Sequence, residues 1–147
     1  MVRIFLIMIL PMLLLSTENN TTDSSFGLLP NLGWLAQRSL GPTVIVGLTY
    51  GNHNMELSNV TGLYGSIEVG QYGQAYNVGV RNGEMLMNSK LMFTHLYVTH
   101  DKGSFDGGHY NGVVFEYNFL MVLNARAGFY IGNQDVNFNF GVGAGFY

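Results

Sequence analysis

Apolar and polar residues alternate along much of this chain, and this period of two constrains the fold more than any other feature. In residues 113–119, valine, phenylalanine and tyrosine occupy one face, whereas Glu116 and Asn118 occupy the other. Successive side chains of a β-strand point to opposite sides, so such segments predict strands with one apolar and one polar face. The clearest segments are Thr43–Tyr50, Leu63–Val69, Ala75–Arg81, Val113–Phe119, Met121–Ile131 and Val136–Phe146.

Charged side chains are scarce. They make up 10% of the 147 residues, whereas soluble domains average about 25%. Beyond the N-terminus there is no apolar run of the roughly 18 residues that a membrane-spanning helix needs. A chain of this length has room for one domain. Few charges, many aromatic residues and alternating strands together predict a transmembrane β-barrel.

The first residues have the order of a secretory signal peptide. A basic residue, Arg3, precedes the apolar run Ile4–Leu15, and the polarity changes at Ser16. We therefore expect a signal peptide over residues 1–16, a flexible polar lead-in over 17–25 and the barrel over 26–147. An uncleaved short anchor is the alternative for the first segment. Cysteine is absent, which excludes thiolate chemistry and a lipid-modified cysteine.

An even number of strands requires one more than the alternation alone supplies. Seven strands are counted from Thr43 onward, and the eighth has to come from Phe26–Ala36, which contains Pro30. Proline is tolerated in a strand only at an edge or an end. The predicted fold is therefore all-β, an antiparallel up-and-down transmembrane barrel of about eight strands. Tight turns are expected at Asn82-Gly83 and at residues 118–120, and the longest loop at residues 101–108.

The polar faces carry few charges, and these are balanced in sign. They are Glu68, Arg81, Glu116 and Arg126, accompanied by asparagine and glycine. Small residues suit the narrow interior of an eight-strand barrel, which side chains nearly fill. We therefore predict that these four residues form a salt-bridge network in the lumen rather than an open pore, with the apolar faces toward lipid. The inverse polarity, an apolar interior as in lipocalin-like barrels, is the alternative.

Tyrosine is frequent and is interpreted as an interfacial girdle. Aromatic side chains with a polar end favour the boundary between a membrane and water. The residues assigned to this girdle are Tyr50, Tyr64, Tyr72, Tyr97, Tyr110 and Tyr130.

One segment, residues 97–110, gathers catalytic residue types. It contains the weak candidates His100, Ser104 and His109 together with two aspartates, and His95 precedes it. A serine hydroxyl beside an imidazole that a carboxylate orients would suit a lipid-modifying hydrolase or acyltransferase. However, Ser104 lies in a glycine-flanked loop, a poor platform for a preorganised nucleophile. The spacing supports a metal site equally weakly, so we predict no enzyme activity, no metal and no cofactor.

Two stretches resemble the small OmpA-like and opacity-type outer-membrane barrels. Residues 113–128, VVFEYNFLMVLNARAG, are similar to the penultimate hairpin of that group, and residues 138–147, FNFGVGAGFY, resemble its last strand. The resemblance spans residues 113–147. It implies that Phe146 and Tyr147 belong to the signal read by the barrel-assembly machinery, although Tyr147 is out of phase with the apolar face.

These features predict a small non-enzymatic barrel with a structural or surface-interaction role in the outer membrane of a Gram-negative bacterium. The expected partners are outer-membrane lipids and the barrel-assembly machinery, and the expected state is a monomer. A net charge of −3 without a cluster of Lys and Arg excludes nucleic acid as a partner. Two alternatives stay open: a lipid-modifying outer-membrane enzyme using residues 95–109, and a soluble secreted lipocalin-like binding barrel.

Overall fold

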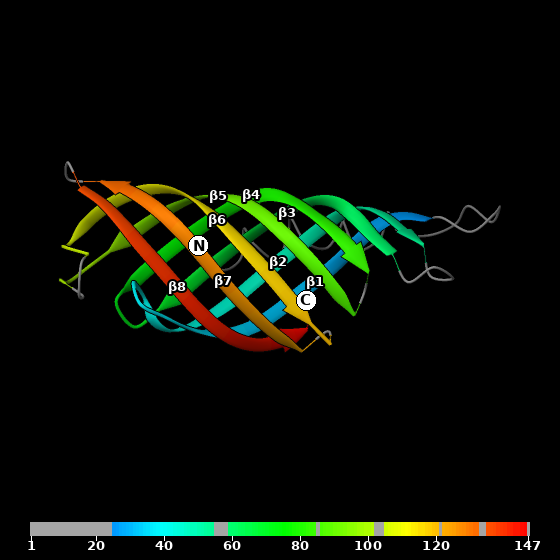
Figure 1. Cartoon of the computed structure of the whole chain (residues 1–147), viewed down its shortest axis with the longest axis horizontal. Coiled ribbons are helices and arrows are strands. Elements are labelled where there is room, and N and C mark those ends of the chain that lie inside the picture. The colour runs from blue at the N-terminus through cyan, green and yellow to red at the C-terminus, as the bar shows by residue number, and fades with distance from the viewer. Residues whose placement is uncertain are drawn as a thin grey trace, which may run out of the picture.

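The chain forms a closed antiparallel barrel. The computed structural model describes residues 25–54, 59–84, 86–101, 105–120, 122–132 and 135–146. Each of the eight strands in these ranges pairs with the next along the chain, and β8 pairs with β1 (Figure 1). The strands are β1 (Ser25–Gln37), β2 (Gly41–Asn54), β3 (Asn59–Gly70), β4 (Gly73–Glu84), β5 (Met87–Val98), β6 (Gly108–Phe119), β7 (Leu123–Gly132) and β8 (Asp135–Phe146). The predicted up-and-down topology is confirmed.

The eighth strand required by the count is confirmed as β1. Proline is accommodated because β1 pairs with β8 only over Leu32–Gln37, so Pro30 lies in the part that pairs with β2 alone. The strand has an open edge there, the setting that proline needs. The expected signal peptide over residues 1–16, and the lead-in up to residue 24, lie outside the described residues.

The barrel has two distinct ends (Figure 1). β1 begins and β8 finishes at one of them, called the terminal end below, together with the links β2–β3, β4–β5 and β6–β7. The other four links lie at the opposite, distal end. The predicted turn at residues 118–120 is wrong by about two residues, because Asn118 and Phe119 belong to β6. The chain turns at the terminal end after Phe119, where Leu120 has a positive φ of 53° and Val122 N–H donates to Phe119 C=O at 3.2 Å.

The predicted turn at Asn82-Gly83 is wrong by about two residues. Both residues belong to β4, and the chain turns only after Glu84. Gly83 still pairs with Asn88 of β5, and its positive φ of 135° lets the backbone follow its partner to the end of the ladder. At the opposite, distal end, the β1–β2 turn also requires a glycine. Gly41 has a φ of 69°, and a Cβ there would lie 2.8 Å from the ring of Tyr72.

The polarity of the wall is the one predicted. Large apolar side chains point outward along every strand, with exposed fractions such as 70% for Phe93 and 63% for Val78. The polar faces point inward, and Glu116 is completely buried. Among the described residues there is no helix of the length and hydrophobicity needed to cross a membrane.

The distal part of the interior is apolar and aromatic. Phe105, from the β5–β6 link, is fully buried, and its ring lies 5.2 Å from that of Tyr110 and 5.8 Å from that of Tyr130, both edge-on. Tyr64 is buried as well. The girdle assignment is therefore wrong for these three tyrosines, because each shares the inward phase of its strand's charged residues. Tyr50 is exposed on the outer wall and Tyr97 is half-buried there.

Candidate functional site

Four charged side chains meet inside the barrel and are called the ion network below: Glu68, Lys90, Glu116 and Arg126. Arg126 forms ion pairs with Glu68 and with Glu116, and its Nε lies 3.1 Å from Glu116 Oε2. Lys90 Nζ lies 2.8 Å from Glu116 Oε1. Lys90, Glu116 and Arg126 stand directly opposite one another on β5, β6 and β7, so strand register alone brings them together.

Neutral side chains complete the coordination of the ion network. Gln37 Nε2 and Asn77 Nδ2 donate to Glu68 at 3.0 and 2.6 Å. Lys90 Nζ lies 4.2 Å from the centre of the Tyr64 ring, a favourable cation–π distance. Buried charges are stable only when they are paired and hydrogen-bonded, and the ion network fulfils this condition.

Arg81, the fourth residue expected in the lumen, is also buried there. It stands opposite Lys90 and donates from Nη1 to Asn31 Oδ1 at 3.0 Å and to Thr49 Oγ1 at 3.4 Å. With Arg81 included, the buried charges of the described residues comprise three cations and two carboxylates, a balance of +1.

Lys90 was missed by the sequence reasoning, although a signal for it exists. On β5, Leu91 and Phe93 face outward, so Lys90 lies on the inward face of the strand. The same alternation places Arg81 on the inward face of β4. Glycine also shapes the interior, because Gly141 stands opposite Arg126 and a Cβ there would lie 2.9 Å from Gln37 Cβ. The interior is thus filled around its charges.

The two weak catalytic candidates among the described residues, His100 and His109, lie on different elements. His109 lies on β6 and faces outward, with its Nδ1 3.2 Å from His95 Nε2 of β5. His100 is exposed in the bend that follows β5, and Ser104 lies outside the described residues. No group of three or more His, Asp or Glu side chains within the described ranges is arranged to hold a metal ion.

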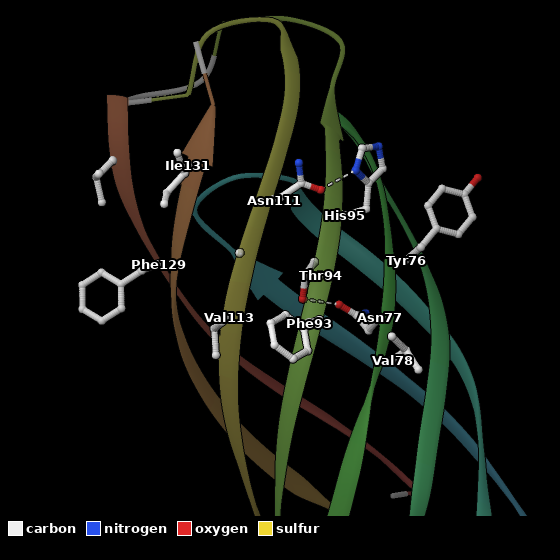
Figure 2. A pocket seen from close by; sticks show the side chains of 12 residues that line it. Tyr76, Asn77, Val78, Phe93, Thr94, His95, Asn111, Val113, Phe129 and Ile131 are labelled. Atoms are coloured by element: carbon white, nitrogen blue, oxygen red, sulfur yellow. Dashed lines mark hydrogen bonds between the residues drawn. The ribbon is translucent and has the colours of Figure 1, made fainter. Parts of the chain in front are cut away.

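A hollow of about 790 Å³ opens on the outer wall beside His95 (Figure 2) and is called the outer hollow below. Its apolar side is a row in which Val78, Phe93, Val113 and Phe129 stand opposite one another on β4, β5, β6 and β7. The next row toward the distal end contains Tyr76, His95, Asn111 and Ile131. Asn111 Oδ1 lies 2.9 Å from His95 Nδ1 within this row (Figure 2). The outer hollow is therefore apolar toward the barrel centre and polar toward the distal end.

Of the two residues expected to signal assembly, Phe146 is the last residue of β8. Phe146 is 71% exposed on the outer wall and stands opposite Leu32 of β1. Tyr147 lies outside the described residues.

Eight-strand barrels of this size serve both as membrane proteins and as ligand-binding proteins, so the fold alone does not assign a function. Comparisons of the chain with protein-family models, with curated proteins and with solved structures gave no match.

Proposed function

We propose that this protein is a small outer-membrane β-barrel of a Gram-negative bacterium, with a structural or surface-interaction role in the envelope and no enzyme activity. The observation that carries the proposal is an outward apolar belt around the whole barrel. A soluble protein would have to expose this belt to water, whereas lipid covers it at no cost. Representative members, one from each strand in order, are Leu32, Val46, Leu63, Val78, Phe93, Phe115, Phe129 and Phe140.

Polar residues border the apolar belt at both ends. Near the terminal end, Thr61 of β3 stands opposite Asn52 of β2 and Asn82 of β4. Gln71 and Gln74 lie near the distal end. A lipid-facing band of limited height with polar borders is the arrangement that a bilayer requires.

Aromatic side chains lie near both borders of the belt. Tyr50 and Tyr117 are close to the terminal end, and Tyr97 is close to the distal end. Aromatic side chains that face outward at two levels favour a position at the two membrane–water boundaries. The resemblance of residues 113–147 to OmpA-like and opacity-type barrels supports the same assignment. By analogy with that group, the terminal end would face the periplasm.

The interior favours a structural role over ligand binding or transport. A lipocalin-like protein needs an apolar cavity, whereas the centre of this barrel holds the ion network. Every member of the ion network is paired with another member inside the barrel, so the ion network offers no free charged group to a ligand. The paired charges link β3, β5, β6 and β7 across the lumen.

The filled interior predicts that the barrel does not conduct ions. Reconstituted into a planar bilayer, the folded protein should give no stable open level, because side chains occupy the lumen from the ion network to Phe105. A matched measurement on a larger porin establishes that channel insertion is detectable. A reproducible conductance that changes when Lys90 is replaced by methionine would contradict the closed interior.

Fractionation tests the membrane assignment directly. Expressed in a Gram-negative host, the protein should be recovered with outer membranes, should require detergent for extraction, and should migrate differently on gels before and after boiling. The host's own outer-membrane barrels and a periplasmic protein serve as controls. Recovery of the folded protein as a monomer in aqueous buffer without detergent would refute the proposal.

A further inference from the structure

We infer that His95 and His109 form a binding site for a divalent late transition-metal ion on the outer wall, at the polar side of the outer hollow. Both side chains are exposed, and they come from neighbouring strands. His95 stands opposite Asn111 and His109 stands opposite Tyr97, so the two histidines are diagonal neighbours on one face. Diagonal positions on adjacent strands are within reach of long and aromatic side chains.

The separation of the ring nitrogens fits one shared ion. His109 Nδ1 and His95 Nε2 lie 3.2 Å apart. Two nitrogens that each bind Zn²⁺ at about 2.0–2.1 Å in tetrahedral geometry are themselves about 3.3 Å apart. Small rotations of the side chains would turn both lone pairs toward a common point. Imidazole nitrogen is a preferred ligand of Zn²⁺, Cu²⁺ and Ni²⁺, and a poor one for Mg²⁺ or Ca²⁺.

Asn111 prepares His95 for this role. The amide oxygen Oδ1 of Asn111 can only accept, so His95 Nδ1, 2.9 Å away, carries the hydrogen. The neutral ring then presents a lone pair on Nε2, the atom that faces His109. Metal-binding histidines commonly donate their second N–H to an oxygen in this way, which fixes both the tautomer and the ring orientation.

The second ring is also held in place. The centre of the His109 ring lies 4.7 Å from that of Tyr97 and 5.3 Å from that of His95. Both histidines belong to paired strands, which position ligands more accurately than loops do. Without metal, His109 Nδ1 donates its hydrogen to His95 Nε2. With metal, that hydrogen moves through solvent to His109 Nε2, so binding to the two neutral rings releases no net proton.

Two protein ligands leave the remaining coordination positions for water or another small ligand. The site is therefore open and exchangeable, in contrast to a closed structural zinc centre with four protein ligands. The inference depends on the two rings and on Asn111, and on the exposed position of both histidines toward the distal end of the outer wall, where water can reach them.

Zn²⁺ titration of the full-length folded protein in detergent micelles tests the site. Calorimetry should give one site per chain, and H95A or H109A should weaken Zn²⁺ binding at least tenfold. H100A is the matched control, because His100 is exposed near the same end but points to no histidine partner among the described residues, and it should bind like the wild type. Equal Zn²⁺ affinity in the wild type, H95A and H109A would overturn the inference.

Two further variants test the role of Asn111. N111A should weaken Zn²⁺ binding by about tenfold or more, the usual effect of removing the partner of a metal-binding histidine. N111D should retain or strengthen binding, because a carboxylate also accepts from His95 Nδ1. If Asn111 had only a structural role, N111A and N111D would bind Zn²⁺ with the same affinity. Heat-dependent gel migration checks that both variants are folded.

Cu²⁺ spectroscopy provides a readout that does not depend on affinity. The electron paramagnetic resonance spectrum of the protein with one equivalent of Cu²⁺ should show hyperfine splitting from two imidazole nitrogens, and H109A should reduce the number to one. A spectrum that is unchanged in H109A would place the ion elsewhere and refute the inference.

Discussion

Replacing Glu116 by glutamine is expected to lower the free energy of unfolding by about 3–5 kcal/mol, the cost of removing one partner from a buried ion pair. Glutamine keeps the size of the side chain but not its charge. Lys90 and Arg126 would both lose an ion-pair partner in the interior, where water cannot replace it. Glu116 is the only carboxylate in the described residues that is paired with two cations of the ion network.

Equilibrium unfolding in urea measures this effect. Trp34 is the single tryptophan of the sequence and lies on the outer wall, so its emission reports the loss of the folded environment. E84Q is the matched control, because Glu84 is exposed at the end of β4, and it should change the free energy by less than about 0.5 kcal/mol. An E116Q variant as stable as E84Q would contradict the ion network.

Charge balance should restore part of the lost stability. The double variant E116Q/K90M removes one buried cation together with the carboxylate, and it should be more stable than E116Q alone. Neighbouring members of one ion network are not additive, so the difference between the single and double variants measures their coupling.

The second large effect is expected on the outer wall. Arginine in place of Leu91 should destabilise the barrel in lipid vesicles by about 2–4 kcal/mol, the range for a cation near the middle of the bilayer. Leu91 lies midway along β5 among outward apolar residues and is 52% exposed. In water the same substitution would carry little cost, because the side chain already faces outward. The size of the effect therefore distinguishes lipid from water as the surroundings of the belt.

A rim substitution provides the control. Gln71 is exposed in the β3–β4 turn at the distal end, and Q71R should be nearly neutral in the same vesicles. The free energies are obtained from unfolding curves followed by Trp34 emission. An L91R variant that is as stable as Q71R would indicate that the middle of the wall does not contact lipid.

The sequence was sufficient for the fold because alternation is a local property. Each strand reveals its two faces within a few residues, and the scarcity of charges indicates which face is buried. The inward positions of Glu68, Arg81, Glu116 and Arg126 follow from phase alone. The same phase places Tyr64 and Tyr130 inside, so the girdle assignment was wrong because it used residue type instead of parity.

Other features depend on the register between strands, which the alternation within one strand does not reveal. Lys90 meets Glu116, and His95 meets His109, only because β5 and β6 pair in one particular alignment. Phe105 was placed in a polar loop, yet it fills the distal interior between Tyr110 and Tyr130. A lone aromatic residue among glycine and aspartate carries no periodic signal, so its burial is visible only in three dimensions.

The pairing of β1 with β8 has a consequence for the order of folding. The other seven pairings join strands that are consecutive in the chain, whereas this one brings Leu32 to Phe146, 146 − 32 = 114 positions later. Closing so large a loop carries the greatest entropic cost and favours late formation. Until then both strands have unpaired edges that can recruit another chain. The ladder between β1 and β8 is thus the stage at which assembly is slowest and most in need of assistance.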